Sequence, residues 1–103
     1  MTFKLQPDPT FWATAELSVP GQPDRVPVPL QFRHQSREEW RVTTDDGKAT
    51  VRDVVSKLVV GWRIEGEEFS PAALERLLNN YLPAAVEIYE TYVRESQESK
   101  RKN

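Results

Sequence analysis

The hydrophobic pattern changes its period about one third of the way along the chain, and this change limits the fold more than any other feature. Up to residue 33, apolar residues alternate with polar ones, as in strands that bury one face. From residue 50 onward they recur at intervals of three and four, as on one face of an α-helix. The sequence therefore predicts an α+β fold, in which an N-terminal β-hairpin precedes three to four α-helices.

Two alternating segments, 11–19 and 26–33, form the predicted hairpin, and the turn-forming sequence PGQPD separates them. The second segment carries Pro27 and Pro29 on the same side of the strand. Because proline has no backbone N–H, these two residues remove two ladder donors on that side. We therefore expect the second strand to lie at an edge or to be loosely paired. A short strand at residues 3–5 is a further candidate.

Capping signals predict where the first two helices begin. Ser36 with Glu39, and Thr50 with Asp53, have the three-residue spacing of a capping box. The first helix is expected to be short, ending near residue 43 before the sequence TDDG. On the second helix, one face carries a run of apolar residues: Val51, Val54, Val55, Leu58 and Val59.

Glycine and proline residues mark the later boundaries. Gly61 is expected to end the second helix in a left-handed conformation, which glycine adopts readily. Ser70 followed by Pro71 predicts a new helix, because proline at the first helical position loses no bonded N–H. Pro83 is expected to kink or restart the chain before a last helix. The apolar positions expected on these helices are Leu74, Leu77, Leu78, Tyr81, Leu82, Ala85, Ile88, Tyr89 and Tyr92.

The chain of 103 residues is expected to form one domain, residues 1–94, followed by a flexible polar tail, residues 95–103. It has no cysteine, which is typical of a protein in a reducing cytoplasm. No apolar run reaches the length of a membrane-spanning helix, and no signal peptide is recognisable. We therefore expect a cytoplasmic protein without a membrane partner.

Residues able to support catalysis or bind a metal are few. His34 is the only histidine, and the sequence offers no partner to activate it. The segment from Asp45 to Gly47 lacks the ligand spacing of a calcium loop, so we interpret it as a turn. Glu65, Glu67 and Glu68 flank a glycine and indicate a solvated connection. No catalytic or nucleotide-binding motif is present. We expect neither an enzyme nor a cofactor or metal site.

Charge argues against nucleic-acid binding, although one regulator class stays as the alternative. The chain holds 14 basic and 16 acidic residues, and they are dispersed along it. A helix-turn-helix regulator would need the two helices around residues 61–70 to form a DNA-binding unit, with the second as the recognition helix. The second of these helices offers Arg76, Asn79 and Asn80, but Glu75 and the acidic loop before it would repel phosphate.

Two interpretations stay open for the aromatic residues of the second half. An aromatic that follows a helix end usually packs back on that helix. Aromatics rimmed by charge are also typical of protein-binding surfaces. The candidate protein-binding residues are Trp62, Phe69, Tyr81, Tyr89 and Tyr92.

These segments resemble a known family, the small tail assembly chaperones of long-tailed bacteriophages and prophages. The resemblance rests on FKLQPDPTFWATAELSVPG, on FRHQSREEW and on VVGWRIEGEEFSPAALERLLNNY, followed by a proline and an amphipathic helix. The order of Gly61-Trp62, an acidic loop and Phe69-Ser70-Pro71 is its most specific part. The segment RVTTDDGKA is more polar than the family's usual helix at that place, so the helix there is expected to be short or irregular.

The resemblance implies an adaptor rather than an enzyme. Chaperones of this kind bind the tape-measure protein, keep its long hydrophobic helices in solution and help to recruit tail-tube subunits. The family has no catalytic motif that could be transferred to this chain. The implied partners are thus the tape-measure and tail-tube proteins, and self-association of the chain is left open.

Overall fold

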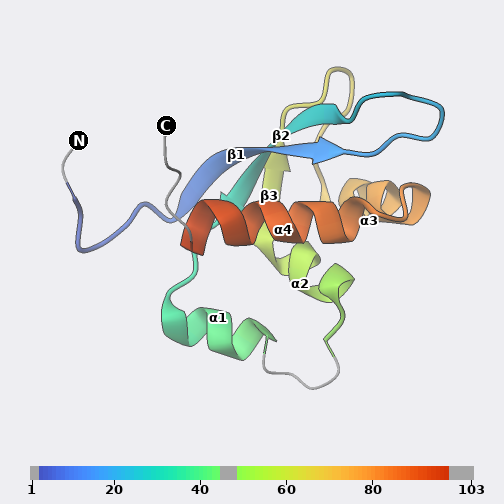
Figure 1. Ribbon diagram of the computed structural model, residues 1–103. Coiled ribbons are helices and arrows are strands. Elements are labelled where there is room, and N and C mark those ends of the chain that lie inside the picture. Colours follow the sequence, from blue (N-terminus) through green and yellow to red (C-terminus); the bar gives the residue numbers. More distant parts are fainter. Residues whose placement is uncertain (1–2, 45–48, 98–103) are drawn as a thin grey trace.

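The described part of the chain, residues 3–44 and 49–97, forms three strands and four helices in the computed structural model. The strands make one antiparallel sheet in the order β1-β2-β3, and α2 and α4 lie on the same side of it (Figure 1). The α+β prediction, with an N-terminal hairpin followed by helices, is confirmed. The expected strand at residues 3–5 is absent, and those residues are exposed and irregular.

Strands β1 (Thr10–Leu17) and β2 (Val26–Arg33) form the predicted hairpin in continuous register. Alternate β1 residues Ala13, Ala15 and Leu17 are buried, while the residues between them are exposed. This alternation directs one face of the hairpin toward the helices. The loop between the strands contains Gly21 at φ 84°, a left-handed conformation that glycine adopts without strain.

The position of β2 corrects the expectation of an edge strand, because β2 is the middle strand of the sheet. Its pairing with β3 covers only Leu30 to Phe32. Pro27 and Pro29 lie in the other half, which has β1 as its strand partner. The N–H of Arg63 donates to the Pro29 carbonyl at 3.0 Å, so the backbone of Pro29 points away from β1. The missing donors therefore face the side that β3 leaves largely unpaired.

Strand β3 (Val59–Trp62) was not predicted, and it corrects the expected role of Gly61. Gly61 is buried within this strand, opposite Gln31 of β2, and does not end a helix in a left-handed conformation. A Cβ atom at position 61 would lie 2.7 Å from the Gln31 side-chain oxygen and 3.3 Å from its Cβ. Any other residue here would force the Gln31 side chain to move, so glycine suits this close approach to the neighbouring strand.

The three predicted helix starts are confirmed. In α1 (Arg37–Thr44), the Ser36 and Glu39 side chains bond each other's backbone N–H groups at 3.2 and 2.9 Å. In α2 (Val51–Leu58), Thr50 and Asp53 form the same reciprocal capping box. In α3 (Pro71–Asn80), Ser70 accepts from Ala73 N–H, and proline occupies the first turn. The turn expected at residues 45–47 lies outside the described residues.

The junction after α3 differs from the expected helical stripe at one position. Helix α3 ends at Asn80, so Leu82 lies in the turn before α4 (Ala84–Gln97) and is 87% exposed. Helix α4 also extends past residue 94, where the polar tail was expected to begin. Residues 98–103 lie outside the described part.

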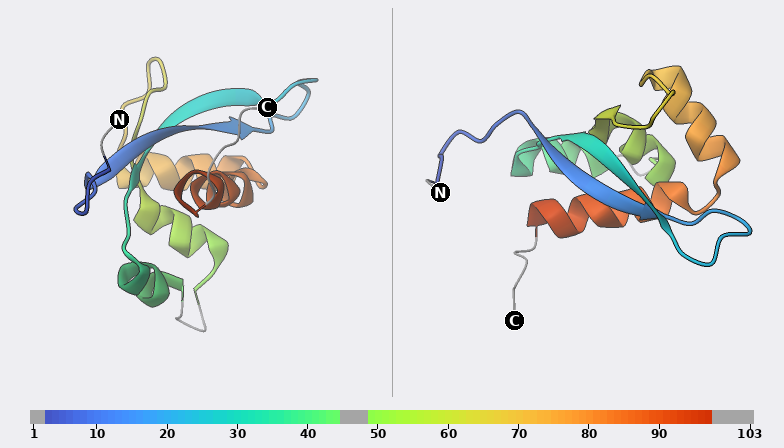
Figure 2. Two further views of the ribbon diagram at one scale, coloured as in Figure 1. Left: turned by 60° about the vertical axis from the view of Figure 1, so that its left-hand side comes forward. Right: turned by 90° about the horizontal axis from the view of Figure 1, so that it is seen from above.

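The core lies between the sheet and helices α2, α3 and α4. Helix α4 packs against β1 and α2, and the right-hand view of Figure 2 shows it running along the hairpin. The largest fully buried side chains come from β2, α2, α3 and α4: Leu30, Phe32, Val55, Leu58, Leu74, Ile88 and Tyr92. This core fixes the end of the hairpin relative to α3, and a surface groove opens between them.

Candidate protein-binding groove

The groove lies where the far end of the hairpin meets β3 and α3, and its volume is about 390 Å³. We call it the Trp62 groove. Its apolar walls come from the hairpin end, from β3 and the loop after it, and from α3 with its last turn: Leu17, Val19, Val26, Val28, Trp62, Ile64, Ala73, Leu77 and Tyr81. Glu67, Arg76 and Asn80 supply the polar part of the lining. An apolar hollow with a few polar groups is typical of a binding site.

Two contacts hold the Trp62 side chain in place. Its indole N–H donates to the Glu67 carbonyl at 2.8 Å, which closes the loop that follows β3. Phe69 packs edge-on against the indole, with ring centroids 5.1 Å apart. An aromatic ring fixed by a hydrogen bond and a neighbouring ring loses little freedom when a ligand binds.

The acidic loop after Trp62 is a tight turn. Glu67 N–H donates to the Ile64 carbonyl at 3.0 Å, and Gly66 takes a φ of 78° between them. Only glycine adopts this conformation without strain, so the sequence of the turn follows from its geometry. Glu65, Glu67 and Glu68 are all exposed, as the sequence predicted.

Tyr81 belongs to the groove because it caps α3. Its backbone N–H donates to the Leu77 carbonyl, and its own carbonyl accepts from Ala84 N–H at the start of α4. The chain thus turns at Tyr81 while its side chain stays half-buried in the groove lining. The structure therefore brings Trp62 and Tyr81 together in one groove, with Phe69 packed behind Trp62.

Tyr89 and Tyr92 lie in a different place, beside α1. Trp40 stacks on both rings, with centroid distances of 6.0 Å to Tyr89 and 5.4 Å to Tyr92. Tyr92 is 2% exposed, and its hydroxyl donates to the Arg33 carbonyl at 3.1 Å. Burial raises the pKa of this hydroxyl. Because a buried ring cannot reach a partner, we leave Tyr92 out of the proposed binding surface. Tyr89 is half-buried, and we leave it out because it lies outside the Trp62 groove.

The hairpin wall of the groove was missed by sequence reasoning. Val19, Val26 and Val28 line it although none was a candidate. Val26 is 39% exposed at the start of β2. Apolar residues on both sides of the PGQPD turn were the available signal, because a hairpin brings strand ends together.

Glu87 of α4 holds this hairpin end against the helices. Its carboxylate is 8% exposed and accepts hydrogen bonds from the backbone N–H and the hydroxyl of Ser18. Arg25 lies 3.7 Å from the same carboxylate. A buried carboxylate with these partners fixes the register of hairpin against helix. It thereby positions Leu17 and Val19 in the groove wall.

The helix pair around residues 61–70 does not form a helix-turn-helix. Strand β3 and the tight turn separate α2 from α3, so no short turn joins the two helices. On α3, Glu75 pairs with Arg52 of α2, and this ion pair lowers the pKa of the carboxyl group. The candidate base-reading residues thus lack the scaffold that would place them in a groove of DNA.

Within residues 3–44 and 49–97, no group of three or more potential ligands is placed to hold a metal ion. His34 directly follows β2, and its backbone N–H donates to the Pro9 carbonyl just before β1. None of the helices in the described part is long and apolar enough to cross a membrane.

A family model described as phage tail assembly chaperone matches residues 1–103, the whole chain. The chain belongs to this family. No curated protein and no solved structure matched it. The resemblance found in the sequence is confirmed, and it gives this tail assembly chaperone a general role among phage tail proteins.

Proposed function

We propose that this tail assembly chaperone binds an amphipathic helical segment of the tape-measure protein in the Trp62 groove. The observation that carries the proposal is the groove itself, an apolar hollow on the surface. Amphipathic helices commonly lay their apolar side chains into such grooves. Covering those side chains would keep the long tape-measure helices in solution before the tail is complete.

Family membership supports the remaining parts of the proposal. The chaperone acts without catalysis or cofactor, in the cytoplasm of the bacterial host, and helps to recruit tail-tube subunits to the tape-measure protein. The charged residues of the groove lining support selective binding of one partner over a general apolar contact. Glu67 and Arg76 place one acidic and one basic group in the lining. A helix with matching charges beside its apolar face would be favoured over others.

Co-expression with the cognate tape-measure protein tests the proposal. We expect the wild-type chaperone to raise the soluble yield of the tape-measure protein and to co-elute with it on size exclusion. Val26→Glu places a charge in the groove wall and should abolish both effects. Val42→Glu is the matched control, because Val42 is 67% exposed on α1 and lies outside the groove. Equal solubilisation by the two variants would exclude the groove as the binding site.

A further inference from the structure

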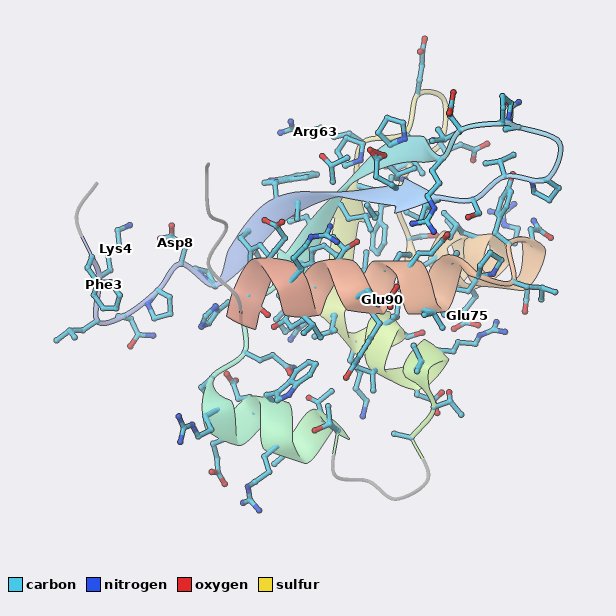
Figure 3. All side chains as sticks on the ribbon, in the orientation of Figure 1. Phe3, Lys4, Asp8, Arg63, Glu75 and Glu90 are labelled. Carbon is cyan, nitrogen blue, oxygen red and sulfur yellow. The ribbon has the colours of Figure 1, made fainter. Side chains whose placement is uncertain are left out.

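A second exposed apolar feature lies at the opposite end of the molecule. Residues 3–9 form an arm without helix or strand, and every residue of it is exposed. Phe3 is 88% and Leu5 is 96% exposed, which are the highest values among the large apolar side chains described. Figure 3 shows Phe3, Lys4 and Asp8 on a segment that leads away from the sheet. Large apolar side chains that are exposed together on one short segment are candidates for an interaction surface.

The Trp62 groove offers the complementary surface. Its walls are apolar, and its lining includes Glu67 and Arg76. The arm carries one basic and one acidic residue, Lys4 and Asp8, which pair with each other at 3.1 Å. An arm seated in the groove could exchange this exposed pair for pairs with Glu67 and Arg76. Arm and groove thus match in apolar character and in charge.

The arm cannot readily fill the groove of its own chain. It leaves β1 at Thr10, whereas the groove begins near Leu17 at the other end of that strand. Strand β1 spans about 23 Å between these two residues at roughly 3.3 Å per residue. Seven residues reach at most about 24 Å when fully extended, and the arm would first have to reverse its direction. In Figure 1 the arm and the hairpin loop point to opposite sides of the molecule.

We propose that the arm of one copy docks in the Trp62 groove of a second copy, with Phe3 and Leu5 as the inserted side chains. The contact joins two different surfaces, so it is head-to-tail, and each copy keeps one free arm or groove for the next. The number of copies in an assembly therefore grows with concentration. The assembly is a closed ring if the rotation between copies closes, and an open filament if it does not. This inference does not depend on the tape-measure protein as the client.

Two variants separate the donor from the acceptor of this contact. Phe3→Ser with Leu5→Ser removes the arm's apolar side chains and leaves the groove intact. Val26→Glu places a charge in the groove and leaves the arm intact. Val42→Ser is the matched control, because it removes an apolar side chain that is 67% exposed on α1, away from both the arm and the groove. Circular dichroism checks that each variant is folded, and Tyr81→Ser is the second groove variant if Val26→Glu is not.

Sedimentation velocity of the purified chaperone, from low micromolar to near-millimolar concentration, gives the decisive result. We expect the wild type and Val42→Ser to form species that grow with concentration, and each of the two other variants alone to stay monomeric. An equimolar mixture of the arm and groove variants should form a dimer that grows no further, because it contains one working arm and one working groove. The inference is overturned if the wild type stays monomeric, if either variant associates like the wild type, or if the mixture forms no dimer.

Discussion

At the scale of single residues, Glu87 supports the groove although it is not part of the lining. It lies on α4 and still fixes the end of the hairpin through Ser18. The partners are far apart in sequence, so neither a motif nor a spacing reveals them. Losing this carboxylate would leave the Ser18 N–H without its acceptor in a part-buried place.

We therefore predict that Glu87→Ala lowers the free energy of unfolding by about 2 kcal/mol, as expected when a charged acceptor of two hydrogen bonds is lost. Glu90→Ala, on the exposed side of the same helix, should change it by less than about 0.5 kcal/mol. Urea denaturation followed by circular dichroism measures both values. Similar values for the two variants would mean that the Ser18 contact contributes little to stability.

At the scale of secondary-structure elements, β3 shows a strand that depends on its neighbour. Its sequence VVGW has two β-branched residues and a buried glycine. The Gln31 side chain passes over Gly61 and donates to the Thr10 hydroxyl at 3.1 Å. All three strands thus meet around the space that a side chain at position 61 would occupy.

Gly61→Val tests this packing. Valine has the higher strand propensity, yet we expect a loss of about 1–3 kcal/mol in the free energy of unfolding, because the added atoms overlap the Gln31 side chain. The same substitution in a Gln31→Ala background should cost clearly less. Thermal or urea unfolding of the four proteins of this double-mutant cycle gives the coupling. Additive effects would show that Gln31 is not the obstacle.

The contrast between α2 and β3 explains what the sequence could predict. Helix starts at Thr50 and Ser70 were predicted because a cap is a local interaction, within three residues. Strand β3 was missed because Val59 continues the helical spacing of Val55, while its pairing with Phe32 comes from a distant part of the chain. The same separation in sequence hid the hairpin wall of the candidate site. Trp62 and Tyr81 were named from the sequence, but the hairpin wall of the groove depends on tertiary contacts.

At the scale of the whole molecule, the arm and the hairpin loop lie on opposite sides of a small scaffold (Figure 1), and the groove opens at the loop end of the hairpin. The proposed client and the arm of a second copy would occupy the same apolar surface. Two ligands for one groove must compete, so self-association would shield the groove until a client displaces the arm. The contact between arm and groove would then cover the apolar surface of the groove. The same contact would limit the access of the client to the groove.

This competition gives a measurable consequence that rests on both proposals. The apparent affinity for a labelled tape-measure segment should equal the affinity of a free groove multiplied by the fraction of grooves that hold no arm. At a concentration where sedimentation shows nine grooves in ten to be filled, the wild type should bind the segment about tenfold more weakly than the Phe3→Ser/Leu5→Ser variant. Fluorescence anisotropy measures the affinities, and Val42→Ser should match the wild type. If the arm variant and the wild type bind the segment equally while the wild type is associated, the arm and the client occupy different surfaces.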